Sequence, residues 1–263
     1  MKFRFQRKYF SIPYVIFLAL FVIVPMFLIA YYAFSDPSGH LSLQAAKKFF
    51  SDPSKIHVIL VSLFIAIETT IICLLIGYPI AYFLASKDYN KNIVLVMLFI
   101  MPMWINFVLR TAATRDILFA IGITGGAHPY LATLIGMVYN YLPFVILPLY
   151  STMLKLDRSQ MEAAADLGAS PVRVFISNVI PQSLPGIISA ITMTLMPVMS
   201  SYVISDALSE GNITLIGNSI YLSFANSQWN NGSFTAFLLL ILVLLTMWNT
   251  NGRKSEEVRG GLW

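Results

Sequence analysis

The chain has 263 residues, of which 57% are hydrophobic and only 11% carry a charged side chain. A soluble protein would carry about 25% charged residues, because its folded core still needs a polar surface. Lipid must therefore replace water around much of this protein. We expect an all-α membrane protein with one transmembrane domain over residues 1–263.

The net charge of +5 does not indicate a nucleic-acid partner. The lysines and arginines stand between and beside apolar runs, and no basic patch interleaved with aromatic residues is present in the sequence. The single cysteine, Cys73, lies inside an apolar run and is predicted to be a small buried hydrophobe. With three scattered histidines and no second cysteine, we expect no metal site.

Six apolar runs are predicted to cross the hydrocarbon core, which is about 30 Å thick. The first follows a basic flank but is too long for a signal-peptide core, so we expect a retained helix. The stretch at 213–224 is amphipathic and too polar to span, and is expected at the outer surface or as a re-entrant segment. The six runs lie at residues 12–34, 58–85, 93–113, 131–154, 184–204 and 234–248, the last being short.

The basic residues indicate the orientation of these spans. With the amino terminus in the cytoplasm, most lysines and arginines fall in the inner segments, as the positive-inside rule requires. We therefore predict both termini inside, an even number of spans, and a permease core at 58–248 followed by a tail at 249–263. The polar loop at 155–178 then lies in the cytoplasm.

This loop contains signals for two short helices. Ser159 and Glu162 have the spacing of a capping box, and Gly168 is a typical helix stop. Ser170-Pro171 then predicts a second helix start. The second helix carries one apolar stripe, at Val172, Phe175, Ile176, Val179 and Ile180. From the residues alone, the loop is either a connector with interfacial helices or a docking site for a soluble partner.

The loop resembles the EAA loop of ATP-binding-cassette importer permeases. The resemblance is carried by Glu162-Ala163-Ala164, by Asp166 to Ser170, and by Ile180-Pro181 and Leu184-Pro185-Gly186. It implies a type I importer permease fold with a cytoplasmic coupling helix, which inserts into a groove of a partner ATPase. The residues it assigns to ATPase coupling are Glu162, Ala163, Ala164, Asp166, Leu167 and Gly168.

The sequence lacks the G-x-x-x-x-G-K-[ST] phosphate loop, so we expect no enzymatic activity and no cofactor on this chain. ATP and Mg are expected on the partner ATPase. A secondary transporter would need several mid-membrane carboxylates, and a membrane enzyme would need a catalytic constellation. Both remain alternatives that the residues favour less.

The resemblance extends to the B-type permease of spermidine/putrescine importers. It is carried by residues 75–85, Pro102-Met103-Trp104, Tyr141 to Phe144 and Ser205 to Leu208. It implies a bacterial inner-membrane protein that assembles with a second permease, two ATPase subunits and an extracytoplasmic polyamine-binding protein. The sequence departs at Ala112, where an aromatic residue is usual, and at Glu210-Gly211, where a glycine pair is usual. Permeases for iron, thiosulfate or another small solute are therefore alternatives.

Polyamines are flexible polycations, so their path needs acceptors and aromatic faces. Glu68, a carboxylate in the middle of a span, is a candidate path residue or a partner of Arg110. Trp104 offers a cation–π face or simple packing, and Tyr139 is a weaker candidate of that kind. Arg110 fits a gate or a pairing role. The predicted path residues are Asp206, Glu68, Trp104, Tyr202 and Arg110.

Overall fold

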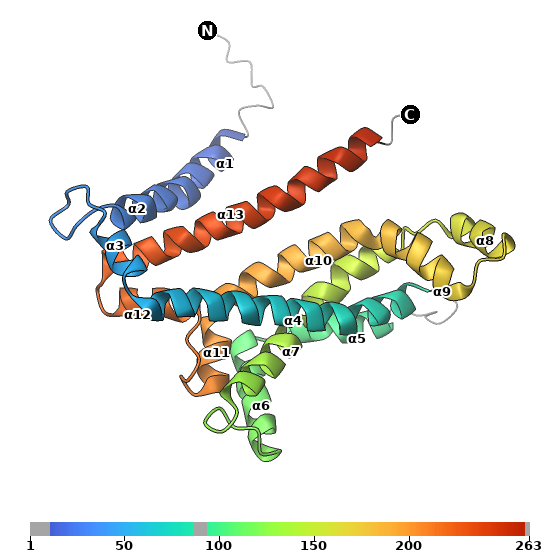
Figure 1. The fold of residues 1–263 in the computed structure, drawn as a ribbon, viewed down its shortest axis with the longest axis horizontal. Helices are drawn as coiled ribbons and strands as arrows, with labels where there is room; N and C mark the ends of the chain where they lie inside the picture. Colours follow the sequence, from blue (N-terminus) through green and yellow to red (C-terminus); the bar gives the residue numbers. More distant parts are fainter. Residues whose placement is uncertain (1–10, 87–93, 261–263) are drawn as a thin grey trace, which may run out of the picture. The chain divides into compact units, whose positions relative to one another are not determined.

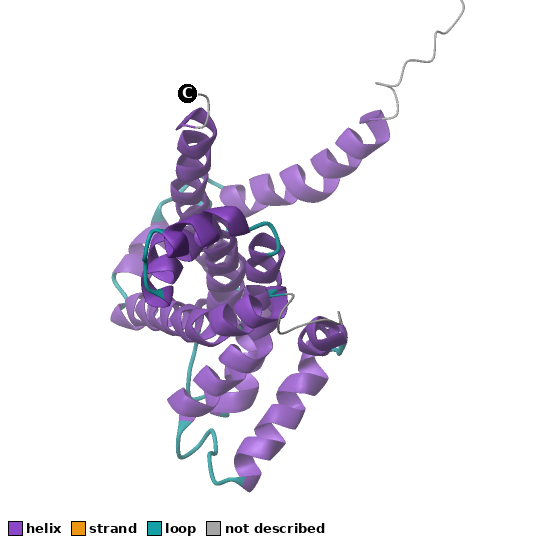
Figure 2. Cartoon of the chain, turned by 90° about the vertical axis from the view of Figure 1, so that its right-hand side faces the viewer, coloured by secondary structure: helices purple, strands orange, loops and turns teal. Residues whose placement is uncertain are grey.

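The structure is a computed structural model that describes residues 11–86 and 94–260 (Figure 1). Helices and loops make up these ranges, as Figure 2 shows, and their only β-type pairing is an isolated bridge between Ser35 and Leu41. The predicted all-α class is therefore confirmed. Apolar runs become helices because, within lipid, every backbone polar group has to be satisfied inside its own segment.

The helices follow one another along the chain with short connections. They are α1 (Ser11–Leu18), α2 (Val24–Ala33), α3 (Gln44–Phe50), α4 (Pro53–Ala85), α5 (Val94–Ile100), α6 (Phe107–Ala120), α7 (Pro129–Met153), α8 (Arg158–Asp166), α9 (Pro171–Val174), α10 (Ile180–Ser200), α11 (Tyr202–Ser209), α12 (Ile216–Ala225) and α13 (Trp229–Gly260). Two π-helical turns, η2 (Ala19–Ile23) and η4 (Phe175–Val179), join α1 to α2 and α9 to α10, and a 3₁₀ turn, η3 (Met101–Trp104), follows α5.

Within the described ranges, five helices are long and apolar enough to span a membrane. They are Pro13–Ala33, Pro53–Ala85, Pro129–Met153, Pro171–Ser200 and Trp229–Thr246. A sixth candidate is a bent pair, Val94–Trp104 and Phe107–Ala120, whose two halves meet at 97°. These five or six candidate spans agree with the prediction of about six, and the third predicted run is bent where the sequence predicted one continuous helix. The short last run extends back to Trp229.

The chain divides into two compact units. The first comprises residues 1–57 and 219–242, and its described part is held together by aromatic packing. The Phe34 ring meets Phe234 and Phe237 edge to face, with centroids 6.2 and 5.2 Å apart. The Asn230 amide donates to the Ser35 carbonyl at 2.8 Å, which ties the start of α13 to the end of α2.

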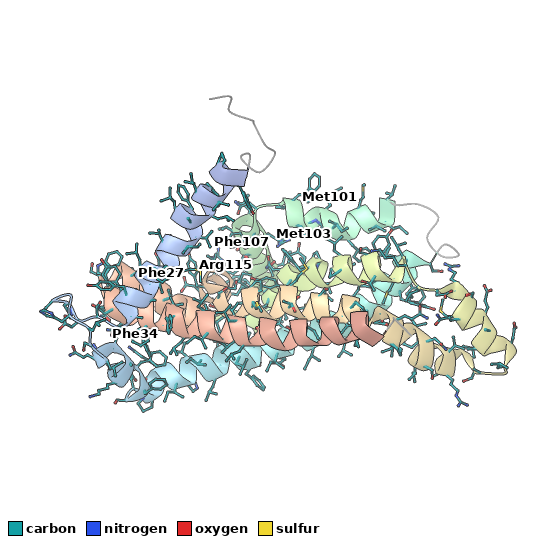
Figure 3. The ribbon with its side chains drawn as sticks, turned by 90° about the horizontal axis from the view of Figure 1, so that it is seen from above. Phe27, Phe34, Met101, Met103, Phe107 and Arg115 are labelled. Atoms are coloured by element: carbon teal, nitrogen blue, oxygen red, sulfur yellow. The ribbon has the colours of Figure 1, made fainter. Side chains whose placement is uncertain are left out.

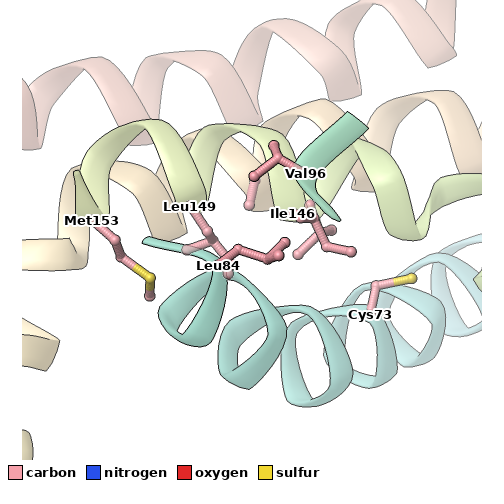
Figure 4. Close-up of a cluster of buried hydrophobic side chains, with 9 residues drawn as sticks. Cys73, Leu84, Val96, Ile146, Leu149 and Met153 are labelled. Carbon is pink, nitrogen blue, oxygen red and sulfur yellow. The ribbon is translucent and has the colours of Figure 1, made fainter. Parts of the chain in front are cut away.

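The second unit comprises residues 58–218 and 243–263. It contains the loop at 155–178, for which a coupling role is predicted and which we call the coupling loop. In it α7 and α10 lie side by side (Figure 1). Figure 4 shows side chains of α4, α5 and α7 packed into one cluster, with Cys73 buried among them as predicted. Small residues permit the close contact: a β-carbon on Gly77 would stand 3.0 Å from a Val145 methyl group. Such close packing stabilises helix pairs in lipid, where apolar burial alone gives little.

The fifth span ends earlier than predicted. α10 stops at Ser200, and the following residues form the separate helix α11. The predicted run to 204 read the two as one, because the chain remains apolar across the break. A glycine in α12 supports this break: a β-carbon on Gly217 would stand 2.2 Å from the Ser200 carbonyl oxygen, so only glycine fits against the end of α10.

Candidate functional site

The coupling loop begins with a capped helix, α8, but the cap differs from the prediction. Asp157 stands at the N-cap with an extended backbone, and its carboxylate accepts from the Ser159 amide at 3.0 Å and from the Ser159 hydroxyl at 2.6 Å. The predicted capping box, with Ser159 as its N-cap, is therefore wrong, because the Asp157 carboxylate accepts the amide bond and starts the helix two residues earlier. These bonds from Ser159 lower the pKa of Asp157 below its ordinary value.

A glycine ends α8, as predicted. Gly168 has φ +83°, and its amide donates to the Ala165 carbonyl at 2.8 Å while the Ala169 amide donates to the Ala164 carbonyl at 3.1 Å. This left-handed turn satisfies carbonyls that the helix end would leave free. The predicted restart is also confirmed, since Ser170 caps α9 by accepting from the Arg173 amide at 3.4 Å, with Pro171 in first position.

The predicted coupling residues present their side chains outward. Glu162, Ala163, Asp166 and Gly168 are exposed and Ala164 is half-buried, while Leu167 is 90% exposed. The face of α8 is therefore accessible from solvent. The role of these residues in ATPase coupling stays a prediction.

The apolar stripe predicted for the second helix is only partly buried. Val179 is buried and Phe175 is half-buried, but Val172 and Ile176 are 68% and 57% exposed. The reason is the π-helical turn η4, in which an extra residue rotates the face away from a 3.6-residue period. Sequence periodicity does not reveal such a turn.

Two contacts fasten the coupling loop to the helices behind it. The Gln182 side chain of α10 accepts from the Asp157 amide at 2.9 Å and donates to the Gln160 side chain at 3.3 Å. The Phe175 ring meets Tyr78 and Tyr82 of α4 edge to face, at 5.8 and 5.6 Å. The Gln182 bonds thus join the start of α8 to α10, and the Phe175 contacts join η4, which continues into α10, to α4.

The mid-span carboxylate is paired with a tyrosine. The Tyr130 hydroxyl of α7 donates to Glu68 Oε2 on α4, and Glu68 is only partly buried. The alternative pairing of Glu68 with Arg110 is wrong, because each has another partner. Tyr130 was not predicted; its position at the start of a span, facing α4, is visible only once the helices are packed.

Arg110 is buried, with 7% of its surface exposed. Its Nε donates to Asn140 Oδ1 at 2.8 Å, and its Nη1 donates to the Pro102 carbonyl at 2.7 Å. The guanidinium also lies 5.8 Å from the centre of the Tyr139 ring. Asn140 was not predicted, although a lone amide inside an apolar run is a signal that could have found it. Tyr139 is already engaged by this cation.

The other candidate path residues lie on exposed elements. Trp104, the last residue of η3, is 88% exposed, and Figure 3 shows Met101, Met103 and Phe107 around the same bend. Asp206 and Tyr202 are exposed on α11, so Asp206 does not end the fifth span as predicted. The candidates thus occupy three elements: α4, the bent span and α11.

Comparison with known proteins shows which family the chain belongs to. No family model matches the sequence. Over 225 residues, the chain is 35% identical to the spermidine/putrescine transport system permease protein PotB of Escherichia coli (strain K12), covering 79% of this chain and 82% of PotB. The chain belongs to the PotB family of permeases.

Solved structures show the fold of this PotB-family chain to be that of an ATP-binding-cassette importer permease. The crystal structure of a bacterial ABC transporter involved in the import of the acidic polysaccharide alginate matches with a TM-score of 0.69 and 15% identity. That match covers 95% of this chain and 94% of the other. The alginate transporter in complex with a pentasaccharide-bound periplasmic protein matches with a TM-score of 0.68, 15% identity, and coverage of 93% and 92%. The predicted membrane permease fold is confirmed.

The structure shows the backbone at Glu210-Gly211, where the sequence resemblance led us to expect a glycine pair. Glu210 ends α11 in the left-handed conformation, at φ 53° and ψ 39°, and Gly211 follows at φ +77°. A glycine pair adopts two such residues without strain, whereas glutamate carries a penalty of about 1–2 kcal/mol. The backbone at position 210 would therefore accept glycine with less strain than glutamate.

Proposed function

We propose that this chain is the transmembrane permease subunit of an ATP-driven importer for spermidine and putrescine. The observation that carries the proposal is the 35% identity to PotB, a spermidine/putrescine permease, over 82% of PotB's length. The importer permease fold and the exposed EAA loop support it.

The coupling loop transmits the movement of the ATPase to the membrane helices. ATP and Mg bind to two separate ATPase subunits, because this sequence has no phosphate loop. The exposed Leu167 and the face of α8 insert into the ATPase. When the ATPase closes, α8 carries α10 with it through Gln182, and Phe175 in η4, at the start of α10, passes the movement on to α4. The displaced helices open the path to the outside.

The cargo path uses carboxylates and aromatic rings. Glu68 supplies a negative charge for an ammonium group, and a carboxylate within a span costs roughly 2.5–3.5 kcal/mol on insertion scales. The hydrogen bond from Tyr130 offsets part of that cost. Asp206 and Tyr202 on α11 receive the cargo at the outer end, and Trp104 contributes a cation–π face.

The assembly needs further chains. A second, homologous permease completes the path, and an extracytoplasmic polyamine-binding protein delivers the cargo, as a periplasmic protein is bound to the alginate transporter. The complex lies in the bacterial inner membrane with both termini of this chain in the cytoplasm.

The test is uptake of labelled spermidine into proteoliposomes that contain the whole transporter and its binding protein. We expect uptake to require ATP and an active ATPase, and to be inhibited by putrescine but not by thiosulfate or iron. Glu68→Gln should raise the KM, while Tyr130→Phe, which keeps the carboxylate, should raise it less. Uptake with an inactive ATPase would contradict the ATP-driven mechanism. Inhibition by thiosulfate or iron, without inhibition by putrescine, would contradict the polyamine assignment.

A further inference from the structure

Arg110 is a permanently charged side chain buried inside a membrane-spanning segment. Its neighbours are neutral: the Asn140 side chain, the Pro102 and Asn140 carbonyls and the Tyr139 ring. Among the described residues, no carboxylate forms an ion pair with it. A guanidinium inside a span is costly unless its N–H groups are hydrogen-bonded. The bonds of Arg110 therefore join parts of the protein that would otherwise be free to separate.

The acceptor on α7 is itself fixed. Asn140 Nδ2 donates to the Gly136 carbonyl at 2.9 Å, which turns Oδ1 toward Arg110. Arg110 Nε donates to this oxygen at 2.8 Å, and Nη2 donates to the Asn140 carbonyl at 3.4 Å. One edge of the guanidinium is thus anchored to a single residue of α7, in the planar fork geometry that arginine provides and lysine lacks.

The other edge reaches across the bend of the third span. Arg110 lies in the first turn of α6, and its Nη1 donates to the carbonyl of Pro102 in η3 at 2.7 Å. Between these two residues the chain turns by 97°. Trp104 lies on this turn, 88% exposed, and is followed by the extended residue Ile105. The bond from Arg110 to the Pro102 carbonyl therefore bridges the bend that contains Trp104.

We propose that Arg110 is a positioning residue that clasps the bend of the third span to α7 and thereby sets the place of the Trp104 ring. Arg110 itself does not contact the cargo, because its donors face Asn140 and Pro102. The inference rests on the proposed function, in which the exposed Trp104 ring receives a cationic substrate. It specifies the gate or pairing role that the sequence predicted for Arg110.

The proposal makes a specific kinetic prediction. Arg110→Gln breaks the clasp, so the KM for spermidine should rise by between about twofold and about thirtyfold, the range of a cation–π contact. Trp104→Leu should raise it by a similar factor, and the double variant by no more than Trp104→Leu alone. A KM that is unchanged or lowered in Arg110→Gln, or additive effects in the double variant, would overturn the proposal. A residue that only repels the cargo would lower the KM when neutralised.

Variants of Asn140 separate the clasp from general folding. Asn140→Asp keeps both acceptors for Arg110 and adds an opposite charge, but it loses the Nδ2 donor to the Gly136 carbonyl, so its KM should lie between that of the wild type and that of Asn140→Leu. Asn140→Leu removes the side-chain acceptor and should behave like Arg110→Gln. Arg110→Lys, whose ammonium cannot bridge both partners, should be intermediate. Equal damage from Asn140→Asp and Asn140→Leu would count against the clasp.

A second measurement is independent of transport. In this chain purified by itself, with Trp229, Trp248 and Trp263 replaced by phenylalanine, quenching of fluorescence by acrylamide reports on Trp104 alone. Arg110→Gln and Asn140→Leu should change the quenching constant, and Asn140→Asp should change it less. If wild-type proteoliposomes take up no spermidine, the proposed function fails while this result still decides on the clasp. Identical quenching in all variants would refute it.

Discussion

The Asp157 carboxylate caps the amino end of α8, the predicted coupling helix. Asp157 is exposed to solvent, and its Oδ1 accepts from the Ser159 amide at 3.0 Å and from the Ser159 hydroxyl at 2.6 Å. A charged acceptor near a helix N-terminus also interacts favourably with the helix dipole. The start of α8, and hence the presentation of Glu162, depends on this side chain being ionised.

This dependence gives a pH prediction. Because the pKa of folded Asp157 lies below its ordinary value of 3.8, its contribution to stability is present above pH 3.8 and is lost as the pH falls through the lowered pKa. Amide hydrogen exchange at 159–161, corrected for the intrinsic rate, should therefore accelerate on acidification. Asp157→Asn keeps an acceptor oxygen but does not titrate, so its corrected rates should stay flat. A parallel acceleration in both proteins would contradict the assignment.

The turn between α8 and α9 sets the direction of the whole coupling element. Gly168 at φ +83° has no heavy atom within 4 Å of the place where a β-carbon would stand, so a substitution there tests backbone conformation without any steric clash. Gly122, in the loop after α6, has φ +85° and equally open surroundings. The two glycines form a matched pair.

We predict that Gly168→Val strains the turn by about 1–2 kcal/mol and weakens copurification of the ATPase, while membrane insertion is retained. Asparagine tolerates the left-handed conformation, so Gly168→Asn should be milder. Gly122→Val carries the same strain away from the coupling loop and should leave ATPase binding unchanged. Copurification is measured by pull-down from detergent. Equal loss with Gly122→Val would show a global effect instead of a local one.

At the scale of the whole molecule, the bent pair decides how often the chain crosses the membrane. α5 with η3 contains 11 residues and α6 contains 14, so neither half reaches about 30 Å at 1.5 Å per residue. The two halves together can cross, as the predicted orientation requires.

Thiol labelling tests this directly. In a Cys73→Ala background, single cysteines at Ser86, His128 and Ser159 precede the bent pair, follow it, and follow α7. We expect Ser86 and Ser159 to be labelled from the cytoplasm and His128 from outside. Labelling of Ser86 and His128 from the same side would mean a re-entrant pair and an odd number of spans.

The sequence by itself determined the features that depend on neighbours along the chain. Hydropathy identified the spans because lipid selects each apolar run separately. The Gly168 stop and the Ser170-Pro171 start were predicted for the same reason, since caps act within one turn. The EAA pattern could be recognised because it is a short, ordered motif.

Only the tertiary structure decided which polar side chains meet. Arg110 and Asn140 are 30 residues apart, and Glu68 and Tyr130 are 62 apart, so their pairing depends on how α4, α6 and α7 pack. The 97° bend was equally hidden, because both of its halves are apolar. A buried charge takes whichever partners the packed helices bring within reach, and for Arg110 these were an amide and a carbonyl instead of the expected carboxylate.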